Sequence, residues 1–331
     1  MIQQAFTKAT LAAAVCAFAG LAATRPAFAQ DAYPNKPVKV IIPWPPGQAT
    51  DLAARIVGEK LSQQLGQPFI MENRPGAGGS IGSDAVAKAA PDGYTLLASS
   101  SGPLSIMPNL QKTPYDAIKD LVPVSLTAKA PFALIAHPSF PANNAREFVA
   151  AVRASPGKYT FSSSGTGATA HLFGELFNST AKLSALHVPF QGSAPAMTAL
   201  IGGQIHYSVE TVASIVGHVK GGRLKIFGVT TATRSAALPD VPTLAEAADL
   251  PGFDAAAWIG YSAPAGTPRE IVVRLAAEIQ KAMQAPDMKE RYLALGLNQA
   301  TSTPDEFAAM MRSEQDRYAA IIKNAGIKIA Q

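Results

Sequence analysis

Cysteine is almost absent from the 331-residue sequence, because the single Cys16 lies in an apolar stretch near the N-terminus. A chain with so little cysteine cannot be held together by disulfides, so its stability must come from hydrophobic cores of ordinary size. Soft metal ligands are equally few, and no two of the five histidines have the i, i+4 spacing of a helical zinc site. We therefore expect neither a metal site nor a cofactor.

Charge is also scarce, since charged residues make up 15% of the chain and hydrophobic residues 48%. This balance excludes a highly charged disordered chain, which could not bury enough apolar surface to fold. The formal net charge is +5, but the lysines and arginines are scattered and form no basic cluster. We therefore expect no nucleic-acid partner. No apolar run after residue 29 approaches the ~20 residues that span a bilayer, which excludes a polytopic membrane protein.

The first 29 residues have the three zones of an export signal. Lys8 precedes an apolar stretch from Ala9 to Ala23, and Ala27-Phe28-Ala29 is a small-x-small cleavage site. An anchor helix is the alternative, but this stretch would rise only ~22 Å, less than the ~30 Å hydrocarbon core. We predict cleavage after Ala29 and a periplasmic location.

Short apolar runs alternate with amphipathic stretches through most of the remaining chain. The predicted strands are Val38 to Pro43, Tyr94 to Ser99, Phe132 to His137, Leu186 to Phe190 and Leu224 to Thr230. The predicted helices are Asp51 to Leu65, Ala145 to Ala154, Thr169 to Phe177 and Pro195 to Ile201. Such alternation favours an α/β fold with largely parallel sheets.

The last 65 residues are predicted to be purely helical. Thr267-Pro268-Arg269-Glu270 and Thr303-Pro304-Asp305-Glu306 share one helix-start pattern. In each, a threonine is the expected cap, proline follows it, and glutamate lies three residues after the cap.

Two proline-rich stretches, Leu121 to Pro131 and Trp258 to Pro268, are interpreted as crossings between domains. If the chain crosses at both, residues 30–130 plus 260–331 form a first lobe and residues 131–259 form an inserted second lobe. Two α/β lobes joined in this way leave a cleft between them, where ligand sites commonly form.

Four loops rich in small residues each lead into an expected helix start. They are Pro43 to Thr50, Ser99 to Gly102, Ser162 to Thr169, and Gln191 to Ser193. Helix N-termini present unpaired N–H groups and a partial positive charge, which suits anionic ligands. None of the loops contains lysine or arginine, so a carboxylate would be bound there by oriented amides and hydroxyls. The alternative is that each is a capped surface turn.

Catalytic motifs are weak. No nucleophile elbow and no phosphate-binding lysine loop occur, and the glycines from Gly76 to Gly82 lack the spacing of a dinucleotide loop. An exported hydrolase using Ser164 and His171 remains an alternative, although a separation of seven residues makes direct contact between them unfavourable. His171 and Glu175 fall on one helical face as an ordinary side-chain pair.

Short motifs run in a fixed order along nearly the whole chain that follows the export signal. They are Asp51-Leu52-Ala53-Ala54-Arg55, Glu72-Asn73-Arg74-Pro75-Gly76-Ala77-Gly78-Gly79, Pro91-Asp92-Gly93-Tyr94-Thr95-Leu96, Ser164-Gly165-Thr166-Gly167, His187-Val188-Pro189-Phe190-Gln191-Gly192, Leu238-Pro239-Asp240-Val241-Pro242-Thr243 and Ala263-Pro264-Ala265-Gly266-Thr267-Pro268. Together they resemble the substrate-binding receptors of tripartite tricarboxylate transporters, often called Bug receptors.

The resemblance implies a two-lobed, type II-like periplasmic binding fold that closes over a small organic acid or amino acid. It also implies membrane transporter subunits as partners, and we expect a monomer. A receptor that acts as a sensor is a further alternative. The residues expected to bind the ligand, from the resemblance and the small-residue loops, are Trp44, Gly47, Gln48, Ala49, Thr50, Ser100, Ser164, Thr166, Gly167, Gln191, Gly192 and Glu210.

Two of these residues depart from the family pattern. Gln48 follows Gly47 where the family usually has a second glycine, and Glu210 stands about where the family often has aspartate. Both positions are expected to sort ligand side groups. For Glu210 the alternative is a carboxylate that caps the next helix.

Overall fold

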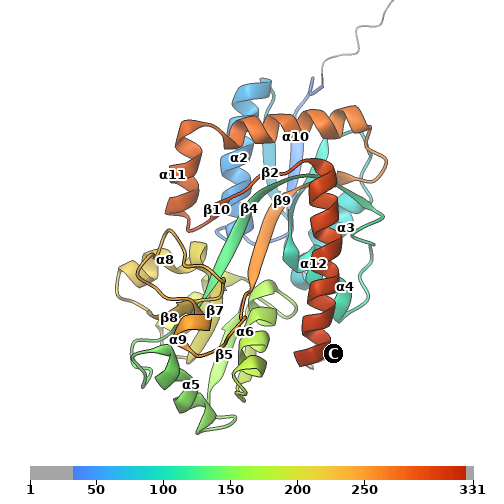
Figure 1. Cartoon of the computed structure of the whole chain (residues 1–331). Helices are drawn as coiled ribbons and strands as arrows, with labels where there is room; N and C mark the ends of the chain where they lie inside the picture. The colour runs from blue at the N-terminus through green and yellow to red at the C-terminus, as the bar shows by residue number, and fades with distance from the viewer. Residues whose placement is uncertain (1–32, 326–331) are drawn as a thin grey trace, which may run out of the picture. The chain divides into compact units, whose positions relative to one another are not determined.

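Two antiparallel strands organise the computed structural model, which describes residues 33–325. They are β4 (Leu121–Ala136) and β9 (Ala256–Pro264), and they pair from Leu121 to Pro131 of β4. Within the described residues, β4 belongs to both parts of a ten-stranded sheet, because beyond Pro131 it pairs with other strands (Figure 1).

The first part of the sheet has the strand order β2-β1-β3-β9-β4. Its parallel strands are β1 (Val38–Ile42), β2 (Phe69–Asn73) and β3 (Thr95–Ser100). β9 lies antiparallel to β3, and the short β10 (Asn298–Gln299) pairs with β4.

The second part has the order β4-β7-β5-β6, with β8 on the other edge of β4. Its strands are β5 (Thr160–Ser163), β6 (Leu186–Pro189), β7 (Tyr207–Thr211) and β8 (Lys225–Val229). β5 is parallel to β6 and β7, whereas β7 and β8 are antiparallel to β4. The expectation of largely parallel sheets is therefore wrong, because every partner of the two long strands runs antiparallel to them.

Helices follow most strands and cover the sheet. In chain order they are α2 (Ala49–Leu65), α3 (Ser80–Ala87), α4 (Met107–Leu110), α5 (Ala145–Arg153), α6 (Thr169–Thr180), α7 (Ser193–Ile201), α8 (Val212–Lys220), α9 (Leu244–Ala247), α10 (Arg269–Met283), α11 (Pro286–Ala294) and α12 (Pro304–Ala325), with the short helical turns η2 (Ala77–Gly79) and η3 (Gly102–Ile106). The predicted helices are all present, and α2 and α7 begin before their predicted starts.

Each part of the sheet has its own hydrophobic core. In the first, Ile41, Leu97 and Leu104 pack with Phe307 of α12. In the second, Ala133 and Ile135 of β4 pack with residues of α7 and α8. This arrangement is a two-lobed α/β fold, as expected. The lobe boundaries near residues 130 and 260 stay a prediction, and Trp258 packs in the first core.

The two proline-rich stretches that were interpreted as crossings lie mostly in strands. Leu121 to Pro131 and the predicted strand from Phe132 form one continuous strand, β4. Trp258 to Pro264 lies in β9. The register between β4 and β9 shifts just after Pro123, and proline is tolerated at such a bulge because its missing N–H is not needed there.

Between residues 267 and 325 the chain forms the helices α10, α11 and α12 with the short strand β10 and connecting residues, so the expectation of a purely helical stretch is wrong there. The predicted capping pattern forms at Thr303, whose hydroxyl accepts from the Glu306 N–H at 3.2 Å. At Thr267 the prediction is wrong, because the cap position of α10 is Pro268 and the Thr267 hydroxyl donates to the Pro264 carbonyl instead.

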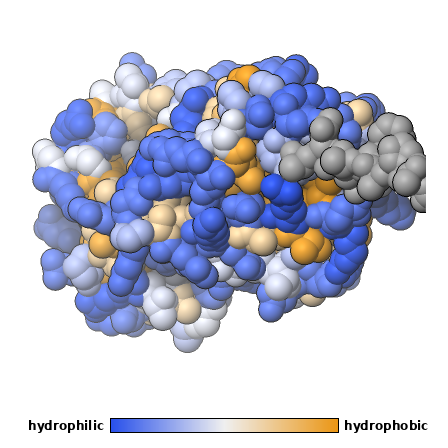
Figure 2. Space-filling view, turned by 90° about the horizontal axis from the view of Figure 1, so that it is seen from above, coloured by the Kyte–Doolittle hydropathy of each residue, from blue (hydrophilic) through white to orange (hydrophobic). Residues whose placement is uncertain are grey.

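The surface seen from the α10 side is mostly hydrophilic, with hydrophobic residues in separate small patches (Figure 2). No helix among residues 33–325 has the length and apolar character needed to cross a membrane. The predicted export signal, its cleavage site and Cys16 lie outside the described residues.

Candidate functional site

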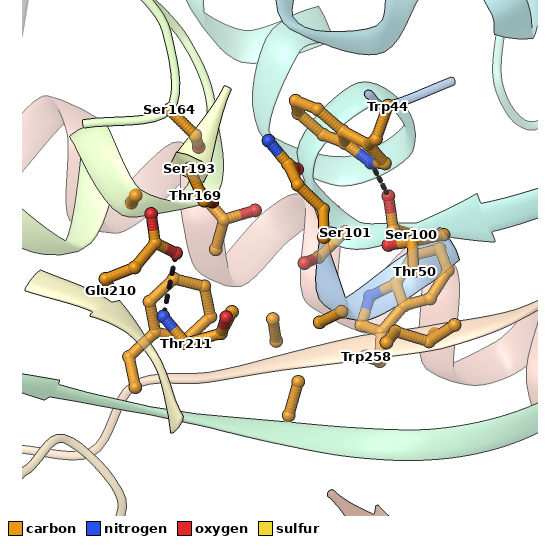
Figure 3. Close-up of a pocket in the computed structure, with 17 residues that line it drawn as sticks. Trp44, Thr50, Ser100, Ser101, Ser164, Thr169, Ser193, Glu210, Thr211 and Trp258 are labelled. Atoms are coloured by element: carbon orange, nitrogen blue, oxygen red, sulfur yellow. Dashed lines mark hydrogen bonds between the residues drawn. The ribbon is translucent and has the colours of Figure 1, made fainter. Parts of the chain in front are cut away.

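A cavity with about 410 Å³ of empty space lies where β4 and β9 run between the two parts of the sheet. Its apolar base consists of Ala130 and Phe132 from β4 and of residues 257–259 from β9. Phe132 is held in place by an edge-to-face contact with Phe173, with ring centroids 4.8 Å apart. The rest of the lining is mainly polar and comes from loops on both sides (Figure 3).

Seven predicted residues line this cavity together, and they come from five separate segments of the chain. They are Trp44, Gln48, Ala49, Thr50, Ser100, Ser164 and Glu210. The lining also includes residues that the prediction omitted, namely Ser101, Ala130, Phe132, Thr169, Ala170, Ser193, Thr211, Ala257, Trp258 and Ile259. Ser101, Thr169 and Ser193 lie within the small-residue loops, so the signal that could have found them was present.

Three helix N-termini reach the cavity. Ala49 and Thr50 begin α2, Thr169 and Ala170 begin α6, and Ser193 begins α7. No side chain caps any of these helices. The first-turn N–H groups of a helix have no partner inside the helix. Three partly positive helix ends therefore face one small space, an arrangement that suits an anion.

The loop before α2 is held by the carboxylate of Asp51, which is 2% exposed. Asp51 accepts from the Gly47 N–H, from Arg55 Nε and from Asn73 Nδ2, each at 2.9 Å. Burial acts to raise the pKa of Asp51, but these hydrogen bonds outweigh burial and lower it. Asn73 also donates to the Trp44 carbonyl. Asp51 therefore fixes the loop from both ends and positions Gln48, Ala49 and Thr50.

Trp44 forms one wall of the cavity. Its indole Nε1 donates to Ser100 Oγ at 2.9 Å, which ties the loop after β1 to the end of β3 (Figure 3). A Cβ atom on Gly102 would lie 2.9 Å from the Trp44 ring and 3.3 Å from Thr169 Oγ1. Glycine at position 102 therefore lets Trp44 and the start of α6 approach each other across the cavity.

A stacked histidine pair supports the loop between β5 and α6. The rings of His171 and His187 are parallel, with centroids 3.8 Å apart. His171 Nδ1 accepts from the Gly167 N–H at 3.1 Å, and His187 Nε2 lies 2.7 Å from Ser163 Oγ. Burial, with a smaller effect of His171, lowers the pKa of His187 to about 3, so this ring is neutral.

A second cavity, with about 670 Å³ of empty space, shares Trp44 and Ser164 with the first. The predicted residues Thr166, Gln191 and Gly192 line this second cavity. Gly47 and Gly167 line neither cavity. Their N–H groups bind Asp51 and His171 instead, so both glycines shape loops at positive φ, +84° and +76°.

Glu210 is the only ionisable residue among the described residues that line the first cavity. It is 1% exposed, and burial raises the pKa of its carboxyl group, although hydrogen bonding by Thr211 and Ser193 opposes this effect. Its Oε1 accepts from the Thr211 N–H at 2.8 Å, whereas its Oε2 has no hydrogen-bond partner. Glu210 does not cap α8, because the Thr211 hydroxyl accepts from the Ser214 N–H there.

The serine and histidine of the hydrolase alternative are not paired. His171 faces Gly167 and Glu175, and the serine that contacts a histidine is Ser163, with His187. Ser163 is fully buried and lies outside the lining of both cavities. Among residues 33–325, no cluster of three or more histidine, cysteine or acidic side chains could hold a metal ion.

Comparison with known proteins places this geometry in a family. Residues 53–327 match the family described as tripartite tricarboxylate transporter family receptor. The chain is 37% identical over 318 residues to protein BugT of Bordetella pertussis, which covers 95% of both chains.

Two solved structures are similar throughout. Rpa4515 of R. palustris with adipate has a TM-score of 0.86 and 30% identity, covering 89% of this chain and 99% of that one. MatC of Rhodopseudomonas palustris with bound malate has a TM-score of 0.82 and 33% identity, covering 88% of this chain and all of that one. The chain therefore belongs to the family of tripartite tricarboxylate transporter receptors, periplasmic solute-binding proteins that include the Bug receptors.

Proposed function

We propose that this receptor binds a small carboxylate in the first cavity and delivers it to the membrane subunits of a tripartite transporter. One observation carries the proposal: three uncapped helix N-termini, of α2, α6 and α7, face a cavity whose described lining contains no lysine, arginine or histidine. Such a site neutralises an anion with oriented amides and hydroxyls, which need no reorganisation and no buried cation.

The relatives support the class of ligand. The structures with adipate and with malate contain organic acids, and both share the fold of this chain. We further propose that the receptor is exported, that it is cleaved after Ala29 and that it acts as a monomer. It has one lobe of residues 30–130 plus 260–331 and another of residues 131–259. Seven of the twelve predicted residues are proposed to line the ligand cavity, and Gly47 and Gly167 to act through loop shape. Thr166, Gln191 and Gly192 are proposed to contribute through the adjoining second cavity.

Catalysis is not part of this proposal. A hydrolase needs a nucleophile within hydrogen-bond reach of a base, at a place where substrate can lie. Ser164 lines the cavity, but His171 uses Nδ1 to accept from Gly167. The family is one of receptors, and two similar structures contain an organic acid.

The proposal is tested by removing one amide from one helix N-terminus. Gln48 has extended backbone angles, φ −76° and ψ 159°, which a following proline accepts, so Ala49→Pro deletes an N–H at the first position of α2 without blocking the helix. A hydrogen bond to a charged group contributes ~1.5–3 kcal/mol, so affinity for a carboxylate should fall about tenfold to a hundredfold.

The matched control is Ala145→Pro at the first position of α5, where the preceding Asn144 is also extended and no cavity residue is involved. A thermal-shift screen of mono-, di- and tricarboxylates identifies a binder, and calorimetry compares the two variants. Equal affinity in Ala49→Pro and Ala145→Pro would reject the site. Stabilisation by neutral sugars alone would reject the ligand class. Uptake of the binding acid by cells with and without the gene distinguishes transport from sensing.

A further inference from the structure

The cavity contains two unpaired donors. Gln48 Nε2 and Trp258 Nε1 are buried lining atoms that have no hydrogen-bond partner in the described chain. Trp258 lies on the side of the α2 N-terminus, where Figure 3 shows it with Thr50 and Trp44. Gln48 Nε2 reaches across toward Gly192, where a Cβ atom would lie 3.5 Å from it. A ligand carboxylate beside these donors would accept hydrogen bonds from groups that otherwise remain unpaired.

The opposite side carries a lone acceptor. Figure 3 shows Glu210 across the cavity from Trp258, beside Ser193 and Thr169. Its Oε2 is completely buried and unpartnered, and Oε1 is already used by the Thr211 N–H. A buried polar atom without a partner is costly, and native structures pair nearly all of them. A hydrogen-bond donor on a molecule in the cavity would supply the missing partner of Glu210 Oε2.

A second unpaired anion would not suit this position. No described lysine, arginine or histidine lines the cavity to offset Glu210. The α6 and α7 N-termini beside it supply only partial positive charge, and like charges in a poorly solvated space repel strongly. A simple dicarboxylate would place a second acceptor beside Glu210. A hydroxyl or an ammonium group would instead donate to it.

We infer that the ligand of this receptor carries, in addition to its carboxylate, a hydrogen-bond donor that binds Glu210 Oε2. The inference rests on the proposed function and narrows its ligand class to hydroxy acids and amino acids. Glu210 is the residue that determines this specificity. A hydroxyl and an ammonium group would both donate a hydrogen bond to Glu210 Oε2. Only the ammonium group carries a positive charge, and this difference distinguishes them experimentally.

The test compares acids of equal carbon number that differ only in the donor. The sets are propionate, lactate and alanine; succinate, malate and aspartate; and glutarate, 2-hydroxyglutarate and glutamate, measured by calorimetry on the processed wild-type protein. In the set that binds, a donor-bearing acid should bind at least about tenfold more tightly than the donor-free acid, because a site built to bond a polar group rejects an analogue that lacks it.

Two variants assign the preference to Glu210. Glu210→Leu removes the acceptor and should bring the ratio between the donor-bearing and the donor-free acid to about one. Glu210→Gln keeps the size and one acceptor but removes the negative charge, so it should abolish a preference for ammonium and retain one for hydroxyl. Glu290→Gln, on the exposed face of α11, is the matched control and should change nothing.

Each outcome bears on whether the ligand carries a donor for Glu210. Wild-type protein that binds a donor-free acid as tightly as its hydroxy and amino counterparts overturns the inference and leaves the proposed function intact. A ratio that survives in Glu210→Leu also overturns the inference. If Glu210→Leu does not fold, the wild-type ratios and Glu210→Gln still decide. If no carboxylate in any set binds, the proposed function fails and the inference fails with it.

Discussion

Burial controls the protonation of one histidine, His187, which lies next to the loop between β5 and α6. His171 and His187 are stacked at the base of the loop between β5 and α6, and hydrogen bonds from Gly167 and with Ser163 hold them. Burial holds the pKa of His187 at about 3. The folded chain therefore keeps His187 neutral over a range of pH in which a free histidine would bind a proton.

This difference predicts that stability falls in mild acid. Between about pH 6.5 and pH 3 the unfolded chain protonates His187 and the folded chain does not, so the free energy of unfolding decreases as pH falls through this window. The free energy of unfolding should decrease by less than ~1.4 kcal/mol per pH unit. One proton sets this limit, and the partial exposure of the ring lowers the effect further. His187→Gln, which cannot titrate, should show a shallower decrease in chemical denaturation from pH 7 to pH 4. An identical pH dependence in the variant would contradict the prediction.

Residue types in the sequence were enough to find much of the candidate site. The scarcity of cations and the abundance of serine, threonine and glycine indicated four loops that contain most of the polar lining, although Ser101, Thr169 and Ser193 were not among the predicted residues. They could not show that the Gly47 and Gly167 N–H groups bind side chains of their own loops, because Asp51 and His171 reach them only once α2 and α6 have formed. They also could not decide whether Glu210 caps a helix or faces the cavity.

Among the elements, α2 shows how a small error in a helix start changes the chemistry. The apolar pattern predicted a start at Asp51, whereas α2 begins at Ala49 and brings two further residues into the cavity lining. The buried face follows Ala53, Val57 and Leu61, while Leu52 and Ile56 are only half-buried. Small alanines let the helix approach the sheet closely, and a hydropathy pattern weights them too little to show this.

The loop before α2 depends on Asp51, which gives a prediction for this element. Asp51→Ala leaves the Gly47 N–H, Arg55 and Asn73 without their shared acceptor, so stability should fall by ~1–3 kcal/mol. Carboxylate affinity should fall at least about tenfold, because Gln48 and Ala49 lose their fixed position. Asp51→Asn keeps one acceptor oxygen and should retain part of both.

Denaturant unfolding and calorimetry measure the two effects. Asp305→Ala is the control, since it removes an aspartate from an exposed ion pair with Arg269 and should change stability very little. Wild-type affinity in Asp51→Ala would show that the loop keeps its shape without this carboxylate.

The long strands were the hardest elements to find. β4 contains Pro123 and Pro131, and prolines at this density are typical of connections. The register shift after Pro123 and the pairing of β4 with four other strands explain how the stretch is nevertheless extended. Such pairing is a long-range property that local residue preferences do not contain.

For the whole molecule, the export signal predicts that the secreted protein begins at Gln30. Intact mass and N-terminal sequencing of the periplasmic fraction measure this directly. A mass that includes residues 1–29, or a lipid on Cys16, would contradict cleavage at this site.

The position of β9 in the chain has a consequence for the order of folding. Leu97 of β3 pairs with Ser262 of β9, so the first part of the sheet lacks a central strand until residue 262 has been made available. Exported chains cross the membrane from their N-terminus, and long-range pairings form late and slowly. The strands β1, β2 and β3 and the first part of β4 therefore stay incompletely paired until β9 is available, while β5 to β8 and the second part of β4 already have their neighbours. We therefore expect the first part of the sheet to be completed only after β9, at residues 256–264, has crossed the membrane.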